Sequence, residues 1–297
     1  MRSLVTGGTG FIGRHLVKKL ERPVVLGRDP KRIHKLLRNV DAFQWSPSSP
    51  PDAKVFEDIN TVFHLAGESV FKGRWTEEKK ERIMRSRVEG TRNLVELLST
   101  LAKPPSTLIC SSAIGYYGPQ GEKILTESSP AGDDFLSRVC IAWEAEASKA
   151  EKLGIRVVLL RTGIVLGGDG GALPQMLTPF RLGVGGRIGS GNQYMSWIHI
   201  DDLVDIMLFA AGTESIRGPV NGVAPAPVTN REFTAALASV LHRPALLQVP
   251  GFVLKITLGE FADVLLGSQR VFPEKATEAG YVFRYPKLNG ALQDLVS

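Results

Sequence analysis

Three glycines near the start of the chain have a spacing that can hold a phosphate. Gly7, Gly10 and Gly13 form the pattern G-x-x-G-x-x-G within "VTGGTGFIGRHLV". Glycines in such a turn let the backbone approach a pyrophosphate, and the free N–H groups at the start of a helix favour negative charge. The same spacing also occurs in plain strand-to-helix turns. We predict a dinucleotide site in which Gly7, Gly10, Phe11, Ile12 and Gly13 surround the pyrophosphate.

The residue that follows the second expected strand, at 24–26, distinguishes two dinucleotides. A site for NAD has Asp or Glu about 20 residues after the glycines, where it bonds the ribose 2′-hydroxyl. Here Arg28 stands near that place, and a guanidinium can pair bidentately with the 2′-phosphate of NADP. Asp29 is expected to point elsewhere, and Lys31 or Arg32 can assist. A solvated basic turn is the alternative; we predict NADP(H).

Backbone groups at the end of the strand expected at 61–67 form the next part of the predicted site. Parallel sheets bind ligands at the carboxyl ends of their strands. We therefore expect His64, Leu65, Ala66 and Gly67 to lie against the adenosine. For the ring of His64, a place in the core is the favoured interpretation.

The strand expected at 106–112 brings hydroxyl groups to the same edge. Ser111 is predicted to contact the cofactor. Ser112, Tyr116 and Tyr117 are candidates for proton transfer. Each tyrosine can instead be an aromatic packing residue.

Two arginines and a threonine complete the predicted cofactor site. Arg87 lies on a long helix expected at 77–101, where it can reach the cofactor or a substrate carboxylate, or form a surface ion pair. Arg161 and Thr162 end the strand expected at 155–163. Arg161 can face the cofactor or bridge to a carboxylate inside the fold.

These residues need a scaffold of alternating strands and helices. Apolar strands separated by helical periodicity are typical of a parallel sheet covered on both faces. We predict an α/β fold of the Rossmann type, a doubly wound parallel sheet, over 1–165 with returning segments near 195–225. The glycine-rich remainder, 166–297, is predicted to be a smaller substrate lobe, with a C-terminal module at about 245–297.

Composition excludes several other classes of protein. The net charge of +6 is scattered without a dense basic and aromatic run, so nucleic-acid binding is not expected. No apolar run is long enough to span a membrane, and we expect no leader peptide before the first strand. The chain has only two cysteines, too few for the disulfide framework of a secreted protein. We therefore expect a cytoplasmic protein without membrane contact. The five histidines and two cysteines show no metal-ligand spacing, so no metal site is predicted.

Several motifs resemble the extended short-chain dehydrogenase/reductases. They are "TGGTGFIG", "FHLAG", "RVEGTRNLVE", "SSAIGYYG" and "WIHIDDLV". The block "RTGIVLGGDGGALPQMLTPFRLGVGGRIGSG" and the tail "GSQRVFPEKATEAGYVFRYP" are similar to an atypical, epimerase-like subfamily that has a C-terminal domain of unknown function. The resemblance implies an NAD(P)-dependent protein whose substrate is a sugar nucleotide and which can pair through its long helices.

The resemblance also implies catalytic residues that this chain lacks. Members with known activity use a Ser or Thr, a Tyr and a Lys four residues after it, with a helper Asn. Arg87 stands in the place of the Asn. Counting back from Glu144 puts Leu136 and Cys140 where the Tyr and Lys belong. A register that begins at Phe135 gives Val139 in place of the Lys, so neither register restores the pair. The Ser position falls on Ser112 or Ala113.

Two functions from different classes remain open. The protein can be an NADP(H)-dependent oxidoreductase or epimerase acting on a small, anionic molecule. Tyr116 or Tyr117 would then donate the proton, with Arg87 lowering the pKa of that tyrosine. Alternatively, it can bind NADP(H) without turnover, as a redox-responsive regulatory protein. A homodimer through the helix at 77–101 is possible in either case.

Overall fold

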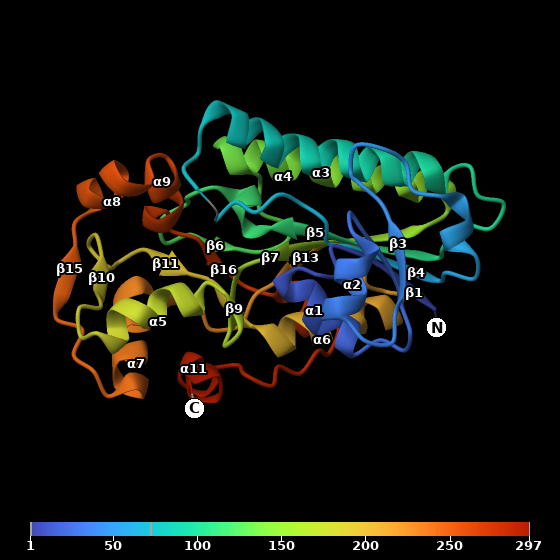
Figure 1. The fold of residues 1–297 in the computed structure, drawn as a ribbon. Helices are drawn as coiled ribbons and strands as arrows, with labels where there is room; N and C mark the ends of the chain where they lie inside the picture. The colour runs from blue at the N-terminus through green and yellow to red at the C-terminus, as the bar shows by residue number, and fades with distance from the viewer. Residues whose placement is uncertain (1, 72, 297) are drawn as a thin grey trace.

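A parallel sheet forms the centre of this computed structural model, which describes residues 2–71 and 73–296 (Figure 1). Its seven described strands all run parallel to their neighbours. Their order is β13 (Gly218–Gly222), β7 (Arg156–Thr162), β5 (Thr107–Ala113), β4 (Thr61–His64), β1 (Ser3–Thr6), β2 (Val24–Gly27) and β3 (Asp41–Gln44). The predicted doubly wound α/β fold is confirmed. The strand β3 was not expected from the sequence.

Helices cover both faces of the sheet because each strand has apolar side chains on both sides. One face, with Val5 and Val158, packs against α1 (Phe11–Lys18), α2 (Pro30–Leu36) and α6 (Ile200–Gly212). The other face, with Leu4 and Val157, packs against α3 (Glu77–Leu98) and α4 (Phe135–Ser148). Figure 1 shows α3 and α4 on one side of the sheet and α1, α2 and α6 on the other.

Side-chain caps start most of the helices that face the site. Thr76 accepts the backbone N–H of Lys79 at 3.2 Å and begins α3. Asp134 accepts the N–H of Ser137 at 2.8 Å and begins α4. By contrast, the N-cap of α1 is Gly10, which offers no side-chain acceptor. The first N–H groups of α1 are therefore left for another partner.

The second lobe has its own apolar core and several small sheets. The strand expected at 155–163 ends at residue 162, and a further strand, β8, follows it. Chain segments after β5 that build this lobe or join it to the sheet are η2 (Ile114–Tyr117), β6 (Ile124–Leu125), η3 (Lys149–Leu153), β8 (Ile164–Gly167), β9 (Gly170–Gly171), α5 (Leu173–Arg181), β10 (Gly186–Ile188), β11 (Tyr194–Met195), β12 (Trp197–His199), β14 (Val228–Thr229), α7 (Asn230–Leu241), β15 (Leu247–Val249), α8 (Gly251–Leu258), α9 (Phe261–Leu266), β16 (Arg270–Val271), α10 (Glu274–Glu278) and α11 (Leu288–Val296). A short turn, η1 (Ala53–Phe56), precedes β4.

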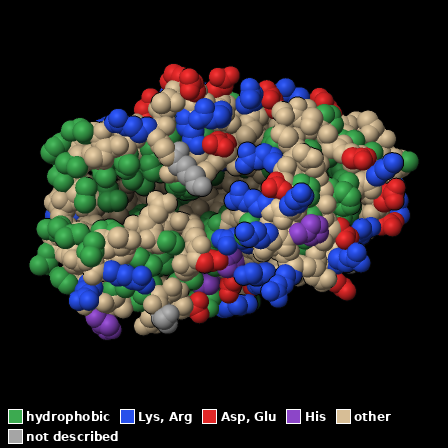
Figure 2. Space-filling model, in the orientation of Figure 1, with side chains coloured by type: hydrophobic (Ala, Val, Ile, Leu, Met, Phe, Trp, Pro, Cys, Tyr) green, Lys and Arg blue, Asp and Glu red, His purple; other side chains and the backbone are tan. Residues whose placement is uncertain are grey.

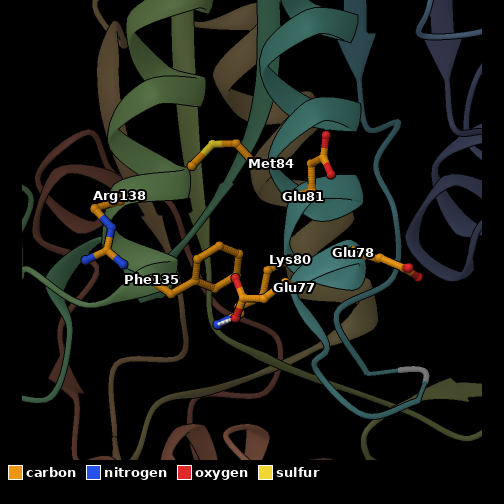
Figure 3. Close-up of a pocket in the computed structure, with 7 residues that line it drawn as sticks. All are labelled: Glu77, Glu78, Lys80, Glu81, Met84, Phe135 and Arg138. Atoms are coloured by element: carbon orange, nitrogen blue, oxygen red, sulfur yellow. Dashed lines mark ion pairs between the residues drawn. The ribbon is translucent and has the colours of Figure 1, made fainter.

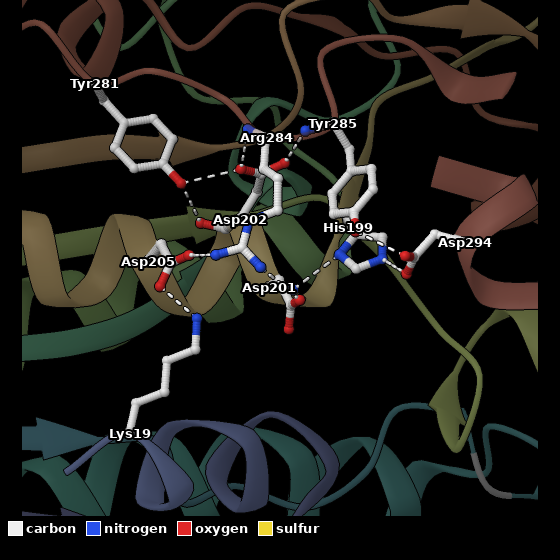
Figure 4. A network of polar contacts seen from close by, with 9 residues as sticks. All are labelled: Lys19, His199, Asp201, Asp202, Asp205, Tyr281, Arg284, Tyr285 and Asp294. Carbon is white, nitrogen blue, oxygen red and sulfur yellow. Dashed lines mark hydrogen bonds and ion pairs between the residues drawn. The ribbon is translucent and has the colours of Figure 1, made fainter. Parts of the chain in front are cut away.

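The C-terminal tail is tied to the start of α6 by buried acceptors (Figure 4). The carboxylate of Asp202 accepts the backbone N–H groups of Arg284 and Tyr285 at 2.8 and 2.9 Å. His199 stacks on the ring of Tyr285, with 3.9 Å between centroids and 28° between the ring planes, and contacts Asp294 at 3.2 Å. Its other ring nitrogen accepts the N–H of the second residue of α6, so His199 is a structural cap.

Candidate functional site

The turn between β1 and α1 is too tight for any residue but glycine at two positions. Gly7 has φ of 72°, and a Cβ on it would lie 2.8 Å from the carbonyl carbon of Leu65. A Cβ on Gly13 would lie 2.3 Å from the carbonyl oxygen of Gly7. The packing of the turn thus accounts for both glycines. What points to an anion is the uncapped start of α1 at Gly10, whose N–H groups and dipole favour a phosphate.

Phe11 can contribute only its backbone to this turn, because its partly buried ring packs elsewhere. The ring lies against the hairpin of β8 and β9, where a Cβ on Gly167 or Gly170 would come within 2.4 or 2.3 Å of it. Asp169, at the tip of that hairpin, contacts His15 of α1 at 3.0 Å. The glycines at this hairpin therefore make room for Phe11 and couple the second lobe to the predicted phosphate site.

Positive side chains gather where β2 ends. Arg28, Lys31 and Arg32 are exposed, and within residues 2–71 and 73–296 none has an ion-pair partner within 4 Å. Asp29 is the N-cap of α2, and its carboxylate accepts the backbone N–H of Arg32 at 3.1 Å. Figure 2 shows a hollow near the middle of this face with Lys and Arg side chains gathered along one side.

The loop after β4 lies close to this basic group. A hydrogen bond from Lys79, helped by the charges of Lys79, Arg82 and Arg28, lowers the pKa of the Glu68 carboxyl. Glu68 is thus ionised at neutral pH and within electrostatic reach of Arg28. The end of β2 and the loop after β4 therefore lie near each other.

His64 was also placed among the cofactor-binding residues, which is wrong for its side chain; the ring lies in the core, the interpretation that the sequence favoured. The ring is fully buried, and its nitrogens lie 2.8 Å from Oγ1 of Thr6 and 3.0 Å from Oγ1 of Thr91. Burial lowers the pKa of His64 to about 4, so the ring is neutral. The backbone N–H groups of Leu65 and Ala66 both point at the same Thr6 oxygen, at 3.2 Å. The ring therefore holds the ends of β1 and β4 together.

Leu136 and Cys140, both on α4, lie near the end of β5. A Cβ on Gly115 would be 3.1 Å from Cβ of Leu136 and 3.9 Å from Sγ of Cys140. Cys140 donates to the carbonyl oxygen of Ala113 at 3.7 Å, and burial raises the pKa of its thiol to about 11. Neither residue can exchange a proton at neutral pH as a Tyr–Lys pair does.

Three predicted site residues belong instead to a buried polar network. Arg161 binds Glu144 through Nε and Nη2, at 2.9 and 2.8 Å, and Ser112 donates to the same carboxylate at 2.6 Å. Nη1 of Arg161 donates to the hydroxyl of Tyr117 at 3.0 Å, and that hydroxyl donates to Asn221 at 2.7 Å. The predicted roles of Ser112 and Tyr117 in proton transfer, and of the Arg161 side chain in cofactor binding, are corrected accordingly.

Tyr117 and Tyr116 differ in how far they are buried. The side chain of Tyr117 is fully buried, and burial raises its pKa to about 12. Tyr116 is half-buried, and its ring centroid lies 3.4 Å from the guanidinium carbon of Arg161. Of the two, only Tyr116 keeps any access to solvent. The sequence had no signal that Asn221, in a buried strand, would accept a hydrogen bond from the hydroxyl of Tyr117.

Arg87 is a guanidinium held at the sheet edge without a carboxylate within 4 Å among the described residues. Its Nη1 donates to the carbonyl oxygens of Glu68 and Ile83 at 2.9 and 3.2 Å. Its guanidinium carbon lies 5.1 Å from the Trp143 ring centroid and faces Gly67, whose Cβ would lie 3.2 Å from it. Burial lowers the pKa of Arg87, which still stays protonated. The structure thus places a cation beside the end of β4.

The remaining predicted residues lie at the ends of neighbouring strands. Ser111 and Thr162 are both half-buried near the carboxyl ends of β5 and β7, which pair in parallel. Thr162 contacts the carbonyl oxygen of Leu160 at 3.4 Å. Their contact with a cofactor stays a prediction, as it does for Gly10, Ile12 and Arg28.

A separate groove of about 420 Å³ lies between the first turns of α3 and α4 (Figure 3). Glu77, Glu78 and Glu81 line it together with Lys80 and Arg138. Lys80 is already paired with Glu77 at 2.6 Å. The acidic lining disfavours an anionic cofactor there. In the described part of the chain, no cluster of three metal-ligating side chains occurs and no helix is long and apolar enough to cross a membrane.

Comparisons with known proteins agree with this geometry. Residues 3–221 match the NAD dependent epimerase/dehydratase family, and residues 249–295 match a domain of unknown function, DUF1731. "Epimerase family protein YfhF" of Bacillus subtilis (strain 168) is 39% identical over 302 residues, covering 100% of this chain and 98% of its own. "Epimerase family protein SDR39U1 homolog, chloroplastic" of Arabidopsis thaliana is 41% identical, covering 98% of this chain and 86% of its own.

A solved structure extends the likeness to three dimensions. The human epimerase family protein SDR39U1 (isoform 2), crystallised with NADPH, superposes with a TM-score of 0.89 and 34% identity over 99% of each chain. The UDP-glucose 4-epimerase of Thermotoga maritima, at 21% identity and a TM-score of 0.80, shares the fold. The extended short-chain dehydrogenase/reductase resemblance is therefore confirmed, and the chain belongs to the NAD dependent epimerase/dehydratase family, with a C-terminal DUF1731 domain.

Proposed function

We propose that this protein binds NADP(H) at the carboxyl edge of its central sheet and uses it to oxidise or reduce a small molecule. The observation that carries the proposal is the pairing of an uncapped α1 N-terminus with unpaired cations after β2. A pyrophosphate fits the first and a 2′-phosphate fits the second. A relative 34% identical to this chain was crystallised with NADPH, which supports the choice of cofactor. The two buried cysteines are free, which suits a reducing cytoplasm.

The choice of NADP(H) over NAD(H) is tested at Arg28. Removing the guanidinium in Arg28→Ala should weaken NADPH binding about 10- to 100-fold, because a hydrogen bond to a charged group contributes about 1.5–3 kcal/mol. NADH binding should change little, since NADH has no 2′-phosphate. Lys35→Ala is the matched control, because Lys35 is an exposed cation near the end of α2, the helix that follows Arg28. Titration by fluorescence or calorimetry measures all six affinities. Equal losses for both cofactors in Arg28→Ala would contradict the assignment.

In the proposed reaction, Arg87 takes over the electrostatic part of the missing Tyr–Lys pair. A cation fixed by two carbonyl oxygens can polarise a substrate carbonyl or stabilise the alkoxide that forms from it. The cofactor would supply or accept the hydride. Tyr116, the half-buried tyrosine at the end of β5, is the candidate proton donor. The substrate is proposed to be a small anionic carbonyl or alcohol, and a sugar nucleotide is proposed on family membership.

This reaction is tested by variants of α3. Arg87→Met should lower kcat about 100- to 1,000-fold, as removing one preorganised donor does elsewhere. Arg85→Met, which loses an exposed pair with Glu89 on the same helix, should leave kcat unchanged. The readout is NADPH consumption against carbonyl compounds and NADP reduction against sugar nucleotides. Equal activity of the Arg87→Met and Arg85→Met variants would rule out this role for Arg87.

A second function is favoured by Leu136 and Cys140, which leave no proton-exchanging pair beside Gly115. The protein would then bind NADP(H) without turnover and respond to the redox state of the cofactor. Tight NADPH binding with no consumption across the same substrate panel would support this function. Failure of both NADPH and NADH to bind would contradict both functions.

A further inference from the structure

Large apolar side chains are exposed together at the free end of the second lobe. Helix α8 has the sequence GFVLKITL and buries none of its residues. We call the exposed group the lobe tip; it consists of Leu182, Val184, Leu246, Leu247, Phe252 and Ile256. Leu246 is 90% exposed, and Phe252 and Ile256 are 66% and 69% exposed. Contact between so much apolar surface and water is unfavourable, and such a surface marks an interaction site.

Backbone pairing brings the segments of the lobe tip together. Strands β10 and β15 pair in parallel with Gly186 opposite Leu247, so residues 182–184, which precede β10, lie near Leu246, which precedes β15. Helix α8 begins two residues after β15 ends. Figure 1 shows α8, β15, β10 and α5 at one end of the molecule, and Figure 2 shows hydrophobic side chains gathered there.

Arginines without a counter-ion flank these apolar side chains. Arg181 directly precedes Leu182, and Arg243 precedes Leu246 by three residues. Both arginines are exposed, and no carboxylate lies within 4 Å of either in the part of the chain that the structure describes. Arg187, on β10, donates to the side chain of Gln248 at 3.0 Å and has no ion pair among the same residues. The lobe tip is therefore apolar with positive charge around it.

The carboxylates of α7 and of the α8–α9 segment are already engaged. Asp263 pairs with Lys255 of α8 at 2.9 Å, and Glu260 pairs with Lys80 of α3 at 3.0 Å. Glu232 belongs to the capping box that begins α7. None of the three is left to neutralise the arginines, so the unpaired charge at this end of the molecule is positive.

Apolar side chains flanked by unpaired cations suit the surface of a membrane that contains anionic lipid. An apolar helix can lie at the boundary between headgroups and acyl chains, while arginines beside it attract the anionic headgroups. Anchor residues of protein interfaces usually fit pockets on the partner, whereas a fluid bilayer needs no complementary shape to receive a protruding side chain such as Leu246. A second copy of this chain would bring the same arginines to the interface, where they would repel. Shape thus favours a bilayer over a protein, and charge favours an anionic bilayer.

We propose that the lobe tip docks this protein peripherally on membranes that contain anionic phospholipid. Phe252 and Ile256 of α8 insert at the headgroup boundary, and Arg181 and Arg243 contact the lipid phosphates. The scattered charge of the sequence had led us to expect no membrane contact, and only the fold brings these separate segments to one end of the molecule. The proposal does not depend on the proposed cofactor or reaction.

Sedimentation with lipid vesicles tests the proposal on the full chain. The wild-type protein should pellet with vesicles that mix phosphatidylserine and phosphatidylcholine, and it should stay in solution with phosphatidylcholine alone. Phe252→Asp combined with Ile256→Asp should weaken binding about 100-fold or more, because two apolar contacts are lost and two like charges face the lipid. The matched control is Ile141→Asp combined with Val282→Asp, at two exposed apolar residues outside the lobe tip, which should bind like the wild-type protein.

The arginines are tested separately from the apolar side chains. Arg181→Ala combined with Arg243→Ala should weaken binding to the anionic vesicles about 30-fold, since each cation near such a surface contributes about a factor of five. Lys35→Ala combined with Lys103→Ala removes the same charge from exposed residues elsewhere and should have little effect. Thermal unfolding checks that every variant is folded.

A fluorescent label locates the docked surface directly. Cys110 and Cys140 are buried, so an introduced surface cysteine is the reactive thiol. An environment-sensitive dye on Ile256→Cys should shift its emission to the blue with anionic vesicles, whereas the same dye on Val282→Cys should not. A wild-type protein that pellets with neither kind of vesicle would overturn the proposal, as would equal losses in the lobe-tip variants and their controls. Binding of polyglutamate through Phe252 and Ile256, without binding to vesicles, would assign the lobe tip to an acidic protein instead.

Discussion

The ion pair between Arg161 and Glu144 offers a sharp test of the buried network. Its side chains are 4% and 9% exposed, and the guanidinium binds both carboxylate oxygens at 2.8 and 2.9 Å. Glu144→Gln keeps the shape of the side chain but leaves the Arg161 charge buried without its counter-ion. Breaking a buried pair from one side costs about 3–5 kcal/mol of the free energy of unfolding. Ser112 also loses a charged acceptor at 2.6 Å.

Glu77→Gln is the matched control. Glu77 is 88% exposed and also forms an ion pair, with Lys80 at 2.6 Å. Exposed pairs contribute about 0–1 kcal/mol, so this variant should unfold almost like the wild-type protein. In urea, with a slope of about 3 kcal/mol/M, Glu144→Gln should shift the midpoint by about 1 M or more. The double variant Glu144→Leu with Arg161→Met should recover much of that loss, because no charge stays buried. Equal midpoints for Glu144→Gln and Glu77→Gln would refute the reasoning.

Two further predictions concern residues near the phosphate turn. His64 has a pKa of about 4 in the folded state and 6.5 unfolded, so the unfolded chain binds more protons between these values and stability is lost as pH falls through that window. His64→Gln should remove about 3 kcal/mol of this pH dependence of the free energy of unfolding, measured by urea titration. His34→Gln, at an exposed site, is the control and should keep the pH dependence of the wild-type protein. Parallel curves of unfolding free energy against pH for the wild-type protein and both variants would contradict the prediction. Gly170→Ala should cost about 1–3 kcal/mol and loosen NADPH binding, because its methyl group would lie 2.3 Å from the Phe11 ring. Gly290→Ala, in α11 with open space around it, should be neutral or stabilising by thermal unfolding, and similar melting shifts for both alanines would exclude the clash.

The buried polar network shows which side-chain roles could not be predicted from the sequence. Ser112, Tyr117 and Arg161 have side chains suited to proton transfer or cofactor binding and lie at or just after strand ends. Their residue types and positions therefore favoured roles in a functional site. Whether such a side chain faces the site or the interior depends on its neighbours in space. The partners that hold these three, Glu144 and Asn221, come from α4 and β13, and no local pattern in the sequence links them.

The sequence by itself determined the features that depend on neighbouring residues. The strand-to-helix turn at Gly7 and Gly13, the alternation that gives a doubly wound sheet, and the absence of a Tyr–Lys pair at Leu136 and Cys140 all follow from short segments. Only the tertiary structure decided which polar side chains are buried and that Phe11 packs against the β8–β9 hairpin. The reason is physical: backbone conformation is set within a few residues, whereas burial and charge pairing are set by segments that meet only when the chain has folded.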